Sequence, residues 1–169
     1  MKGLPRSRSR GSAQVTPITK LNIPLRNFAL TVAGATGVGF GSVVIAGLPA
    51  GNILLLGAVA YAQFSKNGDA DVQDAFDGDF SIGTVATADT DVADAGEADI
   101  IASTALGAAT AGLSPALRAT NATQAILDNT DGSLELNLNL LIDDANISGD
   151  ATFLVNGSLH IAYIALGDD

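Results

Sequence analysis

Carboxylate side chains crowd one segment of the chain, residues 66–79, and carboxylates at this density are the usual ligands of Ca²⁺. The segment reads KNGDADVQDAFDGD, and Asp89, Asp91 and Asp94 form a second, sparser group. The order of an EF-hand loop is absent, because no glycine stands at the sixth place and no glutamate closes the loop. Paired carboxylates also serve acid–base catalysis, but nothing in the sequence places these in a cleft. We interpret the segment as a solvated loop, with calcium binding as the alternative.

The other residue types that support catalysis or nucleotide binding are few. The chain has no cysteine, which excludes disulfides, thiolate metal sites and thiol nucleophiles. Its one histidine, His160, lies in an apolar strand-like segment without a partnered Ser, Asp or Cys pattern, which is typical of a packing or hydrogen-bonding residue. The glycine-rich residues 34–41 lack the G-x-G-x-x-G spacing and no helical pattern follows them, so they indicate a closely packed strand. We therefore expect no enzymatic activity, no metal and no cofactor.

The most apolar part of the chain is a pair of strand-like segments, residues 42–47 and 53–64, on either side of the turn sequence LPAGN. Pro49 suits the second position of a turn and Gly51 the fourth. The pattern predicts a hairpin or an arch, whose faces must be covered by a second sheet or by other subunits. The same region is apolar enough to suggest a membrane span, but its glycines and Pro49 interrupt it, and we expect none.

The remaining elements are also predicted to be strands. The alternation LELNLNL at residues 134–140 predicts a strand with one buried and one wet face. The last strand is expected to run unbroken over residues 151–166, with a bulge near Asn156 and Gly157 rather than a hairpin turn there. Further strands are predicted at residues 28–32, 80–85, 99–102 and 120–127. A chain of 169 residues with this pattern predicts one all-β domain, an antiparallel β-sandwich of the jelly-roll-like kind.

Charge divides the chain into two parts. The first 26 residues contain no acidic residue and six basic ones, whereas the rest contains all 18 acidic residues and two basic ones, a formal charge of −16. We expect an extended basic N-terminal arm over residues 1–26 and a β-sandwich body over residues 27–169. The body should repel nucleic acid, and the arm should bind an anionic surface and add a strand to a sheet edge. The candidate partner-binding residues of the arm are Arg6, Arg8, Arg10, Lys20, Leu21, Ile23, Leu25 and Arg26.

Four stretches of the body resemble the capsid cement, or head decoration, proteins of tailed bacteriophages. They are GLPAGNILLLGA at residues 47–58, FDGDFSIGT at 76–84, LNLNLLIDD at 136–144 and the closing GDD at 167–169. The resemblance implies a structural protein, often a homotrimer, that clamps the outer surface of an icosahedral head and stabilises it against the pressure of packaged DNA. It implies the major capsid protein and copies of the chain itself as partners, a location on the virion, and no direct contact with nucleic acid or membrane.

Two other functions stay open at this point. One is a jelly-roll coat protein whose basic arm points inward at nucleic acid, which salt-dependent binding to DNA or RNA would reveal. The other is a calcium-dependent carbohydrate-binding module, which the aspartates of residues 66–79 would support.

Overall fold

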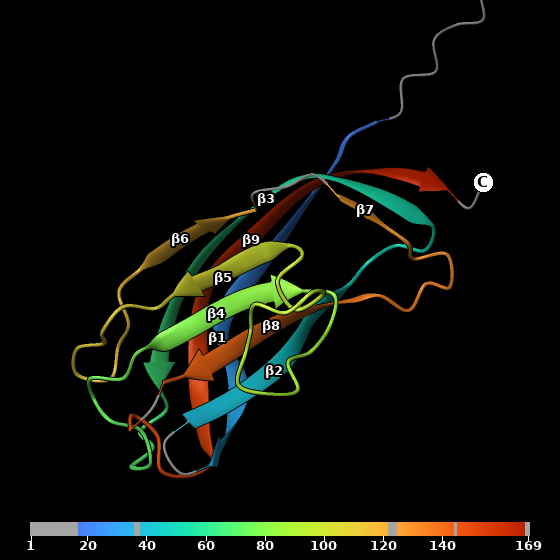
Figure 1. Ribbon diagram of the computed structural model, residues 1–169. Coiled ribbons are helices and arrows are strands. Elements are labelled where there is room, and N and C mark those ends of the chain that lie inside the picture. The colour runs from blue at the N-terminus through green and yellow to red at the C-terminus, as the bar shows by residue number, and fades with distance from the viewer. Residues whose placement is uncertain (1–16, 36–37, 122–124, 144, 168–169) are drawn as a thin grey trace, which may run out of the picture.

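The computed structural model describes residues 17–35, 38–121, 125–143 and 145–167 (Figure 1). Every strand pair within these ranges is antiparallel, and no helix there is long and apolar enough to cross a membrane. The strands are β1 (Thr19–Ala35), β2 (Val38–Gly47), β3 (Asn52–Lys66), β4 (Gly78–Gly83), β5 (Ile101–Ala105), β6 (Leu117–Thr120), β7 (Ala125–Leu127), β8 (Glu135–Ile142) and β9 (Ala151–Gly167).

The strands pair like one long hairpin that is folded over on itself. β1 pairs with β9, β2 with β8, β3 with β6, and β4 with β5. These nested pairs form two layers, which we name sheet A (β1-β9-β3-β6, with β7 beside β3) and sheet B (β2-β8-β4-β5). β1 links the layers, because its last residues, Ala33–Ala35, pair with β2. This is the jelly-roll arrangement, and the predicted all-β antiparallel sandwich is confirmed.

The apolar segments around residues 48–52 form an arch and not a hairpin, since β2 belongs to sheet B and β3 to sheet A. Gly51 has a φ of 99°, which favours glycine, and its N–H donates to the Asn129 carbonyl at 2.7 Å. The fully buried Asn129 amide donates to the carbonyls of Leu48 and Pro49 and accepts from the Leu134 N–H at 2.8 Å. One asparagine from a distant turn therefore fixes the crossover between the layers.

Aromatic and aliphatic side chains fill the space between the sheets. The rings of Phe64 on β3 and Phe80 on β4 lie 5.4 Å apart between centroids, which joins sheet A to sheet B. β8 contributes three fully buried leucines, Leu136, Leu138 and Leu140, as the alternation predicts. The prediction that the other face of β8 is exposed to solvent is wrong, however, because its asparagines are also buried. Residues 84–97 cover that face, and three of their backbone groups form hydrogen bonds with the side chain of Asn139 on β8.

β9 is one strand, as predicted. A bulge does lie beside Asn156 and Gly157, but its extra residue belongs to β1, the neighbouring strand. The register of the β1–β9 ladder shifts between Leu25 and Phe28, opposite Asn156. Asn27 has a φ of 48°, and its side-chain oxygen accepts a hydrogen bond from the Asn156 side-chain amide at 3.1 Å. Gly157 lies so close to β3 that a Cβ there would stand 1.9 Å from the Tyr61 carbonyl oxygen. The glycine therefore serves close strand packing.

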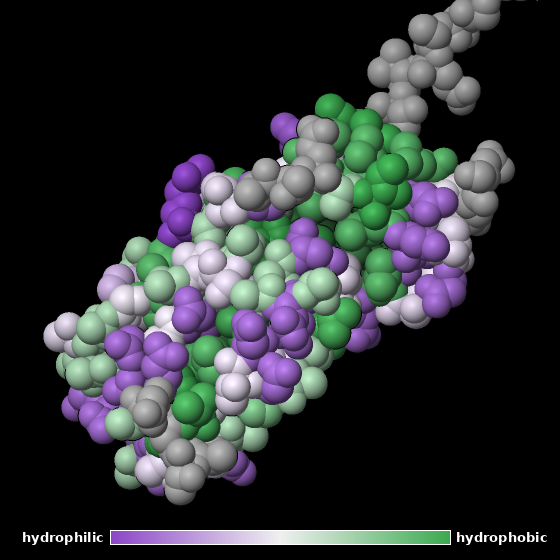
Figure 2. Space-filling model, viewed as in Figure 1, coloured by the Kyte–Doolittle hydropathy of each residue, from purple (hydrophilic) through white to green (hydrophobic). Residues whose placement is uncertain are grey.

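The long strands of sheet A continue past sheet B at one end of the molecule (Figure 1), and hydrophobic residues gather on the surface at that end (Figure 2). We call this the free end of sheet A. Thr19 begins β1 there and pairs with Tyr163 near the end of β9, and β7 pairs with the start of β3 in the same region. The boundary expected between arm and body at residue 26 lies inside β1. The basic N-terminal segment therefore enters the fold at the free end of sheet A.

Candidate interaction surface

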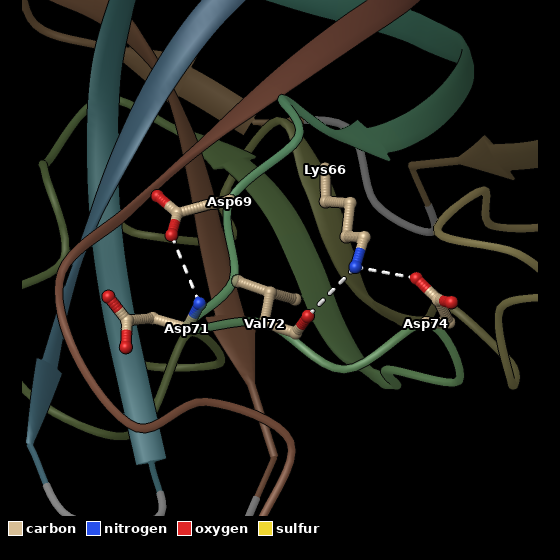
Figure 3. A network of polar contacts seen from close by, with 5 residues as sticks. All are labelled: Lys66, Asp69, Asp71, Val72 and Asp74. Atoms are coloured by element: carbon tan, nitrogen blue, oxygen red, sulfur yellow. Dashed lines mark hydrogen bonds and ion pairs between the residues drawn. The ribbon is translucent and has the colours of Figure 1, made fainter.

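Sheet A is free of acidic residues. Its five strands contain none of the 18 acids of the chain, whereas the four basic residues that the structure describes all lie on it. Lys20, Arg26 and Arg118 are exposed, and the fourth, Lys66, forms an ion pair with Asp74 (Figure 3). Exposed charges of one sign on one layer create a local potential of that sign. Sheet A is thus a cationic surface on a chain of net charge −10.

The acidic residues lie on loops and on sheet B. Asp79 of β4 is half-buried, and its burial, followed by the charges of Asp143, Asp77 and Asp91, raises the pKa of its carboxyl group. These carboxylates come from three separate segments of the chain, so the fold itself gathers them. The strands of sheet A therefore carry no negative charge of their own, and one group of carboxylates gathers beside β4 of sheet B.

The aspartates of residues 66–79 have partners within the protein (Figure 3). Asp69 accepts the Asp71 N–H at 3.1 Å, Asp74 binds Lys66, and Asp77 accepts the side-chain amide of Asn146. Lys66 also donates to the Val72 carbonyl at 3.1 Å. Among the residues that the structure describes, no group of three or more His, Cys, Asp or Glu side chains is arranged to hold a metal ion. The contacts that the structure places here are those of a folded loop.

A shallow hollow of about 620 Å³ lies on the outer face of sheet A, the face turned away from sheet B. Its floor lies where Gly57 of β3 faces Ala162 of β9, and Ala162 in turn faces Lys20 of β1. The next row across the sheet is Val59, His160 and Asn22. The small side chains of Gly57 and Ala162 leave the depression, and its walls are mostly apolar with Lys20 on the rim.

Three polar side chains lie beside the hollow on the same face. The Ser158 hydroxyl and the His160 Nε2 are 3.0 Å apart, and the Tyr61 ring meets the imidazole edge-on at 6.2 Å between centroids. The structure thus gives His160 a serine partner that was not expected from the sequence. The strand period of two places Ser158 and His160 on one face, and this is the signal that could have found the pair. No carboxylate lies on these strands to orient the imidazole, so the pair lacks the third member of a hydrolytic triad.

The structure places the candidate residues of the arm in different settings. Arg6, Arg8 and Arg10 lie outside the described residues. Lys20 and Arg26 are exposed on β1. Leu21, Ile23 and Leu25 point toward the core of their own chain, and Leu25 is 2% exposed. The strand alternation expected at residues 21–25 is therefore present, but it is satisfied by pairing of β1 with β9 of the same chain.

Comparison with known proteins adds no relative. A scan against protein-family models finds no match to this chain, and a search of curated proteins finds no similar sequence. The interpretation of sheet A therefore depends on its own geometry and charge.

Proposed function

We propose that the protein is a structural virion protein of the capsid cement class. It binds the outer surface of a tailed-phage head and stabilises contacts between coat subunits. The proposal includes a homotrimer as the functional unit and the major capsid protein as the partner. It assigns no catalysis to the chain and no direct contact with nucleic acid or a membrane.

The observation that carries the proposal is the distribution of charge along the chain and over the two sheets. The basic residues Lys2, Arg6, Arg8 and Arg10 precede β1 in the sequence, and the strands of sheet A carry no acidic residue. The arm can therefore reach an anionic protein surface without bringing the acidic body against it. The jelly roll supports the same proposal, because rigid β-sandwiches of this kind build viral shells.

Each contact of the arm with the capsid is weak, so the affinity depends on how many such contacts form at once. An exposed pair between an arginine and a carboxylate contributes about 0.2–1 kcal/mol. Arg6, Arg8 and Arg10 together supply a weak attachment per chain, which becomes strong when several linked copies bind one shell. The negative body also favours an outer position, since packaged DNA would repel it.

The test uses heads of the phage that encodes this chain, prepared without the chain. Purified full-length protein and a variant lacking residues 2–16 are added to the heads, and bound protein is measured after sedimentation. We expect the deletion to weaken binding about tenfold or more without lowering the melting temperature, because β1 remains whole. A variant with Arg6, Arg8 and Arg10 changed to lysine keeps the charge of the arm and is the control that should bind like the wild type. Full-strength binding by the deletion variant would refute the role of the arm.

The coat-protein alternative has one observation in its favour, since jelly rolls with basic arms also suit an inward position. It predicts binding to DNA or RNA that weakens steeply with salt, with a slope that shrinks when Arg6, Arg8 and Arg10 are changed to glutamine. The cement proposal predicts no such binding by the net-negative chain at physiological salt.

A further inference from the structure

We propose that copies of this chain associate head to tail, with Val85 of one copy seated in the hollow on sheet A of the next. The inference rests on the proposed function, which includes association of copies, and it assigns the surfaces that make the contact. The two surfaces lie on different sheets of the sandwich, so a chain cannot fill its own hollow.

The hollow has the chemistry and the size of a receptor for an apolar residue together with the loop that carries it. Its floor at Gly57 and Ala162 carries almost no side-chain bulk, and Val59 supplies an apolar wall. Lys20 stands on the rim as an exposed cation, and no acidic residue lies on the strands around it. An apolar group surrounded by carboxylates would therefore meet both an apolar floor and a cationic rim.

Val85 presents such a group on the opposite side of the molecule. It is 49% exposed, yet its backbone is fixed, because its N–H donates to the Gly96 carbonyl at 2.9 Å and its carbonyl accepts from the buried Asn139 amide at 3.1 Å. The loop that carries it also carries acidic residues, among them Asp94 and Asp99, and Asp99 binds the neighbouring Thr84 through both carboxylate oxygens. Val85 is thus an exposed apolar side chain with a fixed backbone on a loop that carries several acidic residues.

Other exposed apolar side chains outside sheet A fit the hollow less well. Val44 lies on β2 opposite the neutral Asn137, and Leu113 lies beside the ion pair of Lys66 and Asp74. Neither β2 nor residues 106–116 carry an acidic residue of their own to match Lys20, whereas the loop of Val85 carries several. The second copy is the occupant that the charges favour, since one chain carries both the cationic hollow and the acidic loop of Val85.

The net charge of −10 does not prevent this contact. At physiological ionic strength the Debye length is about 8 Å, so the facing charges dominate at the interface. A contact between two different surfaces is heterologous, and it closes into a ring when the rotation between copies allows. A mass of three copies would correspond to the homotrimer of the proposed function.

The test is the mass of the purified chain by sedimentation velocity over a range of concentrations. Gly57→Leu places a larger side chain on the floor of the hollow. The variant should fold normally, because the nearest atom to a Cβ at this glycine is 3.8 Å away. Gly47→Leu is the matched control, since a Cβ there meets nothing within 4 Å and the site is away from the hollow. Val85→Ser removes the exposed apolar side chain, with Val44→Ser as its control.

We expect the wild type and both controls to associate as concentration rises. Gly57→Leu and Val85→Ser should each raise the dissociation constant about tenfold or more, with unchanged circular dichroism. Mixing Lys20→Glu with Asp94→Lys should restore association that each variant lacks alone. A wild type that stays monomeric, or association that Gly57→Leu and Val85→Ser leave unchanged, would overturn the inference. A monomer that still binds heads would contradict the association of copies but agree with the binding of the chain to the capsid. An oligomer that does not bind heads would contradict the capsid-binding role.

Discussion

The side chain of Asn139 holds residues 84–97 against the outer face of sheet B, and its replacement by alanine should be strongly destabilising. The amide group is fully buried. It donates to the carbonyls of Val85 at 3.1 Å and Glu97 at 2.9 Å, and its oxygen accepts the Thr87 N–H at 2.9 Å. Asn139→Ala removes all three hydrogen bonds. It leaves the Val85 carbonyl and the Thr87 N–H without a partner, whereas the Glu97 carbonyl still accepts the Ser81 hydroxyl at 2.8 Å.

The expected cost follows from these groups. A buried polar group that loses its partner costs about 1–3 kcal/mol, and water that enters under the loop recovers part of this. We therefore expect Asn139→Ala to lower the free energy of unfolding by about 2–4 kcal/mol, because two buried backbone groups lose their partner. The matched control is Asn137→Ala on the same strand, because Asn137 is also buried but makes one long hydrogen bond, to the Glu135 carbonyl at 3.3 Å. Its cost should be about 1 kcal/mol.

Urea unfolding followed by circular dichroism measures both variants, and hydrogen exchange reports the loop directly. Amide protection at Thr87 should fall in Asn139→Ala and persist in Asn137→Ala. Equal losses of stability in the two variants, or unchanged protection at Thr87, would refute the assignment of Asn139 as the residue that orders this loop.

Three further changes have outcomes that the structure sets. Asp79→Asn removes a carboxyl group whose pKa is raised by burial and by neighbouring aspartates, so the ionisation of this group opposes folding as pH rises. We expect the variant to have a higher free energy of unfolding than the wild type at pH 7 and the same value near pH 3, and a lower value at pH 7 in urea unfolding would contradict this. Gly157→Ala places a Cβ 1.9 Å from the Tyr61 carbonyl oxygen at a φ of 149°, and it should give little folded protein in a solubility and melting assay. The control Gly47→Ala should melt like the wild type, and normal folding of Gly157→Ala would show that β9 and β3 are further apart. Asn129→Ala should cost about 2–4 kcal/mol, because three backbone groups of the arch lose their partner, and a melting temperature within a degree of the wild type would show that the turn holds without it.

Local patterns in the sequence were sufficient for the fold class and for the approximate positions of most strands. They did not predict that β1 begins at Thr19, nor that β6 ends at Thr120 where one strand over residues 120–127 was expected. The leucine alternation on β8 and the turn at Pro49 and Gly51 follow from near neighbours in the chain. The choice between hairpin and arch did not, because it depends on Asn129 and on the pairing of β2 with β8. The burial of Asn139 also depends on partners far along the chain, since Val85 precedes it by 54 residues.

The candidate surface was only partly visible in the sequence. The absence of acidic residues from β1, β3 and β9 can be read from the chain, but their meeting in one sheet follows from long-range pairing. The hollow needs Gly57 opposite Ala162, a register that no local pattern specifies. Conversely, Leu21, Ile23 and Leu25 were expected to serve a partner because their alternation resembles an added strand. Pairing with β9 places that strand in its own sheet.

The most direct test of the proposed function is a cryo-electron microscopy reconstruction of heads from the phage that encodes this chain. We predict jelly-roll density on the outer surface of the shell, with the N-terminal residues before Pro17 in contact with coat subunits. The acidic side of sheet B should not face the packaged DNA. Heads without such density, or jelly rolls that form the shell itself with their arms turned inward, would contradict the proposal.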